Sequence, residues 1–313
     1  MALGTNNTTT TTAASYIPSL WSNEIIATYK SNIVLGNLVT KINHNGKKGN
    51  TLYIPNFTRQ SASSKGAGSQ VTLVAPTDTK VTVSLNKHYE YSTLIEDIVD
   101  VQGLSSLRRA YTDDAGYALA KQVDSDLHAQ FESLQGGGAS GTGAWAGAVI
   151  GGDGSTAYNQ ASTGNGTDIT DAGIRAMILT LDNADVPMEN RAMVIPPICK
   201  SDLLGLSRFT EQAFTGQSGK GNPIINGRVG EIYGMPVYVS TNCPTEYAAD
   251  FSTTYRVGHI FHKSALVFAE QMAVRTQTQY KQEYLGDLFT ADTIYGVAEL
   301  RDNAGVSFVV PAT

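Results

Sequence analysis

The feature that most restricts the fold is an ordered trio of elements between residues 46 and 134. A strand-like run at Thr51–Phe57 leads into a polar stretch at 58–70, and a second strand-like run ends near Ile95. A long helical pattern at 105–134 follows almost at once. A two-stranded ribbon alone is at best marginally stable in water. This ribbon has few candidate partners in its own chain, so it favours contact with a neighbouring subunit and indicates an assembling protein rather than an enzyme.

The second run of the ribbon alternates with a period of two, which predicts a single β-strand. The residues on one face are Val81, Val83, Leu85, Lys87, Tyr89 and Tyr91. The first run contains Pro55, which suits an edge strand, and residues 60–70 predict a mobile polar tip. Two interpretations stay open: an ordinary hairpin packed on the core, or an arm that projects over a neighbouring subunit.

The helical pattern carries apolar residues at a strict spacing of four. They are Leu107, Tyr111, Ala115, Leu119, Val123, Leu127 and Phe131. Four residues turn a helix by about 400°, so the stripe moves round by about 40° per step. This predicts a spine helix, about 45 Å long at 1.5 Å per residue, that contacts different elements along its length. Its acidic pairs, Asp113 with Asp114 and Asp124 with Asp126, diverge on a helix and predict a solvated face or salt bridges across a subunit contact.

The remainder of the chain alternates helical and strand patterns after a Gly-rich stretch at 136–166. We expect an arm with a short helix at 16–39, a helix at 171–184 capped by Thr170 or Asp168, a strand at 191–197, a short helix at 201–206, two strands at 227–240, further strands at 255–269 and a hairpin at 297–310. The helix at 171–184 presents Ile174, Met177, Ile178 and Leu181 on one face, which predicts that this face is buried.

Composition excludes several classes of protein. A net charge of −6 with only 16% charged residues argues against a dedicated nucleic-acid binder. The Thr/Asn-rich residues 1–15 predict a disordered start, and they lack the basic and apolar regions of a signal peptide. No run reaches the roughly 18 apolar residues of a membrane helix, so we expect assembly in a cytoplasm. Cys199 and Cys243 predict two free buried thiols rather than a disulfide framework.

We find no constellation typical of catalysis. The nearest match to a phosphate-binding loop, residues 216–221, lacks the first glycine and the Ser or Thr after its lysine. His259 and His262 fall on opposite faces of a predicted strand, and His44, His88 and His128 stand alone in the sequence. We therefore predict no catalytic residue, no metal site and no cofactor.

Taken in order, these stretches resemble the major capsid protein of tailed double-stranded DNA bacteriophages, with the Hong Kong 97-type fold. The stretches that carry the resemblance are the N-terminal arm, the hairpin, the spine helix, RAMVIPP at 191–197 followed by a Leu-rich helix, GRVGEIYGMPVYVS at 227–240, and the closing YGV at 295–297 with DNAGV at 302–306. The resemblance implies an α+β chain. Its parts would be an N-terminal arm at 1–45, an extended hairpin (E-loop) at 46–96, a peripheral (P) domain at 97–135 and 266–313, a Gly-rich linker at 136–167, and an axial (A) domain at 168–265.

The resemblance also implies a function. The chain would form hexamers and pentamers of an icosahedral shell that encloses double-stranded DNA, and would be a late, structural protein of the virion. Its partners would be further copies of itself, a separate scaffolding protein, a portal protein, packaged DNA bound without specificity, and a decoration protein as a further candidate, with no membrane. The residues expected at subunit contacts are Trp21, Arg59, Lys65, Arg108, Arg109, Asp113 and Asp114. Covalent crosslinking between Lys65 and Asn303, which some members of the family use, is a minor alternative.

Two other functions stay open from the sequence. An encapsulin-like bacterial nanocompartment would use the same fold around a protein cargo. A β-rich adhesin or fibre-type binding protein would account for the Thr, Asn and Gly content, although the long spine helix speaks against it.

Overall fold

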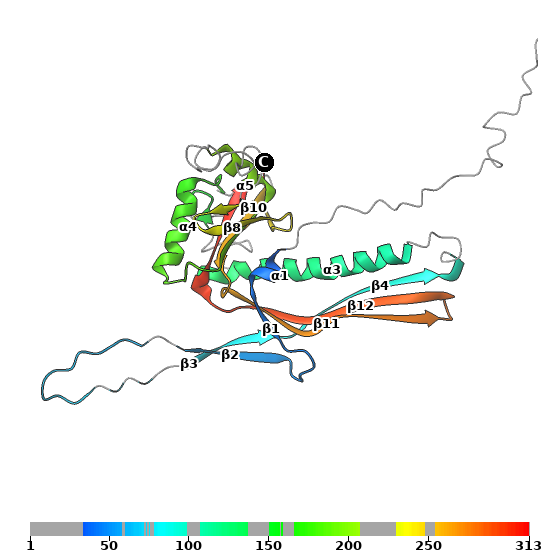
Figure 1. Cartoon of the computed structure of the whole chain (residues 1–313), viewed down its shortest axis with the longest axis horizontal. Helices are drawn as coiled ribbons and strands as arrows, with labels where there is room; N and C mark the ends of the chain where they lie inside the picture. The colour runs from blue at the N-terminus through cyan, green and yellow to red at the C-terminus, as the bar shows by residue number, and fades with distance from the viewer. Residues whose placement is uncertain are drawn as a thin grey trace, which may run out of the picture.

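The computed structural model describes residues 34–57, 60–71, 73, 75, 78–98, 107–136, 150–156, 158, 166–206, 230–247 and 254–312. Within these ranges helices and strands are mixed, and the strands form three sheets. A long helix lies beside an elongated sheet, a more rounded body stands at one end of that helix, and a narrow hairpin extends away from both (Figure 1).

The elongated sheet has the strand order β1-β11-β12-β4. Its strands are β1 (Thr40–Asn43), β11 (Leu266–Lys281), β12 (Gly286–Glu299) and β4 (Lys87–Glu96). The α3 helix (Leu107–Gln130) lies along this sheet and continues into the 3-10 helix η2 (Phe131–Gly136).

The spine helix contacts different elements along its length, as its spacing predicts. Ala115 and Leu119 pack against Phe289 and Ala291 of β12. Two turns further on, Leu127 and Phe131 belong to another core, which includes β10 residues such as Val257 and Phe261. Tyr111, at the start of the same stripe, is 37% exposed. The precession of the apolar stripe therefore lets one helix bridge two sheets.

The rounded body contains a seven-stranded sheet. The strands in order are β5 (Ile150–Gly151), β13 (Gly305–Pro311), β10 (Thr254–His262), β6 (Arg191–Ile195), β8 (Met235–Val239) and β7 (Glu231–Ile232), and β9 (Thr245–Tyr247) pairs with β10. The α4 helix (Asp171–Asn183) buries Ile174, Met177 and Leu181, as predicted, and Ile178 partly. Thr170 is its N-cap, because its hydroxyl accepts a hydrogen bond of 3.0 Å from the Gly173 amide. The α5 helix (Pro197–Gly205) begins earlier than the predicted 201, with proline in its first turn.

The start of α4 packs backbone to backbone against the loop after β5, and Gly173 permits this approach. A Cβ at position 173 would overlap the carbonyl oxygen of Gly152. We expect Gly173→Ala to lower the free energy of unfolding by about 1–3 kcal/mol through this overpacking. Gly116→Ala in α3 is the matched control, because a Cβ there meets nothing within 4 Å and alanine favours a helix by roughly 0.5–1 kcal/mol. Urea unfolding of both variants measures the difference, and equal effects would contradict the packing argument.

The projecting hairpin is shorter than the sequence pattern predicts. The β2 strand (Thr51–Phe57) pairs antiparallel with β3 (Asp78–Ser84), but the predicted single strand breaks at Leu85. The Leu85 side chain is buried and its amide donates to the carbonyl of Asn50. After this break the chain enters β4, which pairs with β12 in the elongated sheet. The alternating pattern therefore covers two strands of two different sheets.

The predicted hairpin at 297–310 is wrong. The β12 strand ends in the elongated sheet, a 3-10 turn (Asp302–Ala304) follows, and β13 pairs antiparallel with β10 in the other sheet. Residues 305–310 are all buried, because β13 has neighbouring strands on both edges and packed side chains on both faces. The closing strand thus lies in the rounded body rather than beside β12.

Parts of the predicted arm and linker lie outside the described residues. Of the arm, the structure describes the single-turn helix α1 (Leu35–Leu38) and β1, whereas Trp21 lies outside. Of the Gly-rich stretch, β5 joins the seven-stranded sheet through parallel pairing with β13. Cys199 and Cys243 are free and buried, as predicted.

Candidate functional site

The projecting hairpin presents aromatic side chains to solvent. Tyr53 is 57% and Phe57 is 77% exposed, and the Lys80 ammonium lies 4.1 Å from the centre of the Tyr53 ring. The other face of the hairpin base is anchored, because Leu52 and Ile54 pack on the core around Val83 and Val267. The base is therefore fixed to the body while the aromatic face is left for a contact outside the chain.

Beyond the paired strands, the described part of the hairpin tip is exposed throughout. This includes Lys65, whose position confirms that the tip is polar and accessible. One turn is visible, in which Ser69 donates to the carbonyl of Gly66 through both its amide and its hydroxyl. Arg59, the other expected contact residue of the hairpin, lies outside the described residues.

A groove lies between the rounded body and the outer end of the paired hairpin strands, where Phe57 pairs with Asp78. A cavity of about 360 Å³ is lined by Phe57 of β2, by the loop at 183–187 after α4, and by Arg301 and Asn303 in the turn before β13. Asn303, the candidate crosslink acceptor, thus lies near the end of β2 that leads toward the tip, and Lys65 is not among the residues that line this cavity.

The two predicted acidic pairs of the spine helix lie in different surroundings. Asp113 and Asp114 are exposed, as predicted. The prediction is wrong for Asp124 and Asp126, which are buried. Asp126 accepts a hydrogen bond of 2.6 Å from the Tyr295 hydroxyl and lies 3.1 Å from the Lys87 ammonium. The backbone of Arg108 and Arg109 lies in the first turn of α3.

Asp124 connects three parts of the chain. It accepts hydrogen bonds from the Leu35 amide of α1 at 3.0 Å and from the Asn242 side chain at 3.1 Å. Burial raises the pKa of its carboxyl group, and the hydrogen bonds oppose that shift. His128, one turn along α3, hydrogen bonds to His259 of β10 at 3.1 Å. The interpretation of His128 as an isolated residue is therefore wrong.

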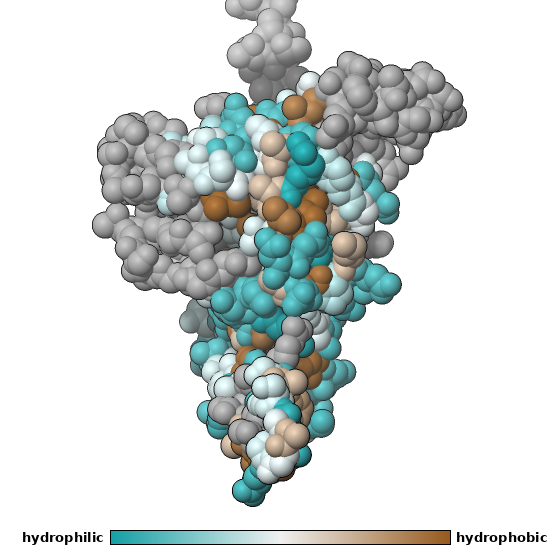
Figure 2. Space-filling model, turned by 90° about the vertical axis from the view of Figure 1, so that its left-hand side faces the viewer, coloured by the Kyte–Doolittle hydropathy of each residue, from teal (hydrophilic) through white to brown (hydrophobic). Residues whose placement is uncertain are grey.

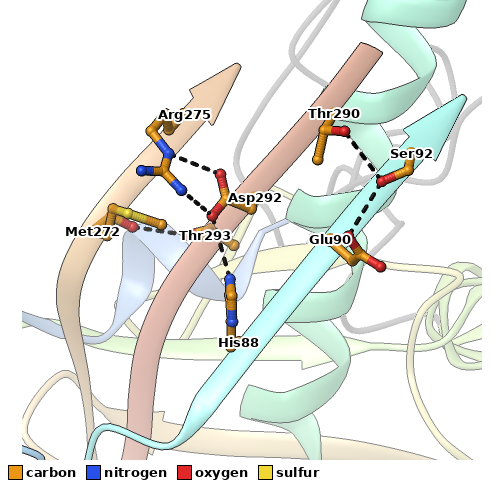
Figure 3. Close-up of polar contacts among 8 residues, drawn as sticks. All are labelled: His88, Glu90, Ser92, Met272, Arg275, Thr290, Asp292 and Thr293. Carbon is orange, nitrogen blue, oxygen red and sulfur yellow. Dashed lines mark hydrogen bonds and ion pairs between the residues drawn. The ribbon is translucent and has the colours of Figure 1, made fainter. Parts of the chain in front are cut away.

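The face of the elongated sheet opposite α3 carries a charged group (Figure 3). Arg275 of β11 binds Asp292 of β12 through two hydrogen bonds of 2.8 and 3.1 Å, and His88 of β4 lies 3.3 Å from the same carboxylate. These bonds to Arg275 lower the pKa of Asp292. Hence His88 does not stand alone either. The group ties the three strands together and is partly open to solvent.

The far end of the elongated sheet exposes a second apolar group. Ile98, Tyr280, Tyr284 and Leu285 are exposed there, around the turn between β11 and β12. The Tyr280 hydroxyl donates to Asp97 at 2.7 Å and the Asp97 amide donates to the Leu285 carbonyl, so the turn is fixed to the end of β4. Seen from the side of the hairpin and the rounded body, hydrophobic residues instead form separate patches between hydrophilic ones (Figure 2).

The described residues offer little for catalysis or for metal binding. No group of three or more His, Cys, Asp or Glu side chains in the described ranges is placed to hold a metal ion. Burial raises the pKa of Cys243 to about 12 and that of Cys199 further still, so both thiols stay protonated and unreactive at neutral pH. Among the described helices, none has the length and apolar character of a membrane span.

Comparison with known proteins identifies the family. The model of the family of phage capsid proteins matches residues 22–307. The chain belongs to the phage capsid proteins. It is a shell protein of the virion, and the match favours this role over the encapsulin-like and adhesin alternatives. No curated protein sequence matches the chain.

Solved structures agree on the Hong Kong 97-type fold. A chain from Mycobacterium phage Che8 is 23% identical, with a TM-score of 0.71 over 94% of this chain and 97% of that one. The capsid of cyanophage P-SCSP1u is 16% identical, with a TM-score of 0.73 over 97% and 96%. The capsid of cyanophage Pam1 is 12% identical, with a TM-score of 0.73 over 100% and 98%. At such low identity the likeness concerns the fold, and it extends over 94% to 100% of this capsid protein.

Sequence reasoning missed the Arg275–Asp292–His88 group and the apolar end of the elongated sheet. His88 and Asp292 are 204 residues apart, and no local pattern reveals such a pair. The run Tyr284-Leu285-Gly286 is a usable signal, because two large apolar residues directly before a glycine are unusual for a solvated loop.

Proposed function

We propose that this capsid protein self-associates into hexamers and pentamers of an icosahedral shell, and that the hairpin is its main link between neighbouring subunits. The observation that carries the proposal is the exposure of Tyr53 and Phe57 on an arm that leaves the body of its own chain. Burying a large apolar side chain is worth about 1.5–3 kcal/mol. Repeated around a ring of subunits, such contacts stabilise a closed capsomer.

The remaining expected contact residues extend this proposal. Lys65 on the tip and the acidic pair Asp113–Asp114 on α3 are exposed charges of opposite sign, which favours pairing between subunits. Surface pairs of this kind contribute only about 0–1 kcal/mol, so they set the register of the contact rather than its strength. Trp21, Arg59, Arg108 and Arg109 remain candidates on the basis of sequence alone.

The division into an arm at 1–45, a hairpin at 46–96, a peripheral domain at 97–135 and 266–313, a linker at 136–167 and an axial domain at 168–265 remains a prediction. We propose a purely structural role without catalysis. We also propose a separate scaffolding protein, a portal protein and a decoration protein as partners. The acidic balance of the chain fits a container that holds DNA without gripping it, because affinity for DNA grows with the number of phosphates neutralised.

Negative-stain electron microscopy of the purified protein tests self-assembly. The chain is expressed alone and together with a scaffolding candidate encoded by a neighbouring gene. We expect closed shells of tens of nanometres in at least the second sample. Monomers and small oligomers in both samples, at protein concentrations well above those of a phage lysate, would sink the proposal.

A further inference from the structure

A buried chain of polar groups joins the spine helix to the seven-stranded sheet. Nδ1 of His128 lies 3.1 Å from Nε2 of His259, and Nδ1 of His259 lies 3.0 Å from the Ser307 hydroxyl of β13. The Ser307 hydroxyl donates to the carbonyl of Phe131. Hydrogen bonds between these side chains thus join three elements, α3, β10 and β13.

Both imidazole rings are enclosed. His128 and His259 are almost fully buried, and the His259 ring stacks on Phe131 with 4.1 Å between ring centres and 13° between planes. Burial makes a positive charge costly at this place, because the ring loses its contact with water. The two histidines are therefore neutral in the closed arrangement.

The contact between the two rings has room for one proton between the facing nitrogens but not for two. In the neutral pair, one nitrogen of the 3.1 Å contact donates and the other accepts. If both rings were protonated, two N–H groups would face each other. The nearest carboxylate, Asp124, lies 3.7 Å from Nε2 of His128 and already accepts from Leu35 and Asn242. The charged pair is thus incompatible with the closed junction.

We propose that His128 and His259 form a proton-operated latch between the spine helix and the seven-stranded sheet. While both are neutral, the latch holds α3 against β10 and, through Asp124, holds the start of α1 and the loop that carries Asn242. When both take up protons, the junction opens locally and lets water in. This property belongs to the single chain and is independent of the proposed role of the hairpin.

The direction of the pH dependence follows from burial. Burial lowers the pKa of His128 from 6.5 to about 3 and lowers that of His259 well below 6.5. Below pH 6.5 the open state therefore binds protons that the closed state does not. The stabilisation of the closed state is complete above pH 6.5 and is lost as the pH falls toward 3. Each histidine changes the opening equilibrium by up to about tenfold per pH unit.

Asp124 is the titratable group that faces the pair from its own helix, and it acts in the opposite direction. Because burial raises its pKa, the closed state takes up this proton before the open state does. β13 and the loop after β8 contribute the neutral side chains Ser307 and Asn242. The opening equilibrium should therefore depend on pH less steeply than an uptake of two protons would make it.

The two cysteines provide a matched readout. Cys243 lies in the core around the junction, with Leu35, Leu127 and Phe131, and Cys199 lies in the core beneath α4. Both are buried. We expect local opening of the junction to expose Cys243 more than Cys199, whereas unfolding of the whole chain exposes both equally.

The test is thiol labelling of the full-length unassembled chain with 4,4′-dithiodipyridine, which also reacts in acid, from pH 7.5 to pH 4, quantified by mass spectrometry. We expect the labelling rate of Cys243 relative to Cys199 to rise at least tenfold between pH 6.5 and pH 5. The double variant His128→Gln, His259→Gln should lose most of this rise. His44→Gln, in the loop after β1, is the control and should keep the wild-type profile.

Two results would overturn the latch. One is parallel labelling of both cysteines in the wild-type chain, which means general unfolding. The other is a wild-type profile in the double variant. If the double variant does not fold, the single variant His128→Gln is measured instead. Its ratio of Cys243 to Cys199 labelling should depend on pH less steeply, by about one proton, and an unchanged pH dependence would count against the proposal. The wild-type comparison of the two cysteines decides in any case.

Discussion

Deleting residues 60–70 from the hairpin and closing the gap with a short Gly-Ser turn should leave a folded chain that no longer builds stable shells. The described tip is exposed along its whole length, so its removal takes no side chain from the core. Its loss shortens the arm that reaches a neighbour, and each lost 1.4 kcal/mol of contact energy weakens association about tenfold. Urea unfolding should match that of the wild type, while sedimentation and electron microscopy should show capsomers or monomers in place of shells.

A matched variant separates the effect of the length of the hairpin tip from the effect of its side chains. Replacing residues 60–70 by a Gly/Ser sequence of the same length keeps the span of the arm but removes Lys65. If this variant assembles and the deletion does not, the tip acts through its length. Normal particles from the deletion itself would contradict the role assigned to the hairpin, whatever the second variant does.

Phe131→Ala should destabilise the folded chain by about 3–5 kcal/mol, the usual cost of truncating a fully buried aromatic ring. Phe131 is buried at the end of α3, stacks on His259 and lies 4.8 Å, centre to centre, from Phe261. Its removal leaves a cavity where the spine helix meets the seven-stranded sheet. Equilibrium unfolding in urea measures the loss as a lower midpoint at an unchanged slope.

Tyr111→Ala is the control from the same apolar stripe. Tyr111 is 37% exposed, so its truncation should change stability by no more than about 0.5 kcal/mol. A large difference in stability between the two variants supports the argument that the apolar stripe winds from an exposed position at Tyr111 to a buried one at Phe131. Similar losses would mean that the stripe is buried evenly and that its precession has no energetic consequence.

The parts of the fold that depend on local periodicity were accessible from the sequence. Residues spaced three and four apart identified the buried face of α4, and the two candidate caps, Thr170 and Asp168, placed its start to within a few residues. The spacing of four in α3 predicted a helix that contacts different elements along its length. Such patterns are readable because the face of a helix is determined by neighbours in the sequence.

The errors share a different cause, which is pairing between distant segments. The alternating run through Leu85 reads as one strand, since alternation does not say which sheet a strand joins. The last strand reads as half of a hairpin with β12, because adjacent strands usually pair. Asp124 and Asp126 read as solvated, because their partners Leu35, Asn242 and Tyr295 lie far away in the sequence. A buried carboxylate is recognisable only once those partners are placed.

The candidate contact surface shows the same division. Exposure of Lys65, Asp113 and Asp114 followed from local polarity, whereas the exposed Phe57 did not, since an aromatic residue in a predicted strand is usually core. The group of Arg275, Asp292 and His88 depends on the register of three strands. Surfaces that a subunit offers to its neighbours are thus only partly readable from one chain.

The break at Leu85 has a mechanical consequence. The chain passes from β3 of the hairpin straight into β4, whose residues 87–96 are all in register with β12. A pull on the hairpin along its length therefore loads this whole ladder in shear, so that its hydrogen bonds resist together instead of yielding one after another. Tension carried by one arm would thus be spread along the strand that lies beside the spine helix. The proposed link between subunits would then be a tether anchored along the strand direction of the sheet, in which the whole ladder resists together.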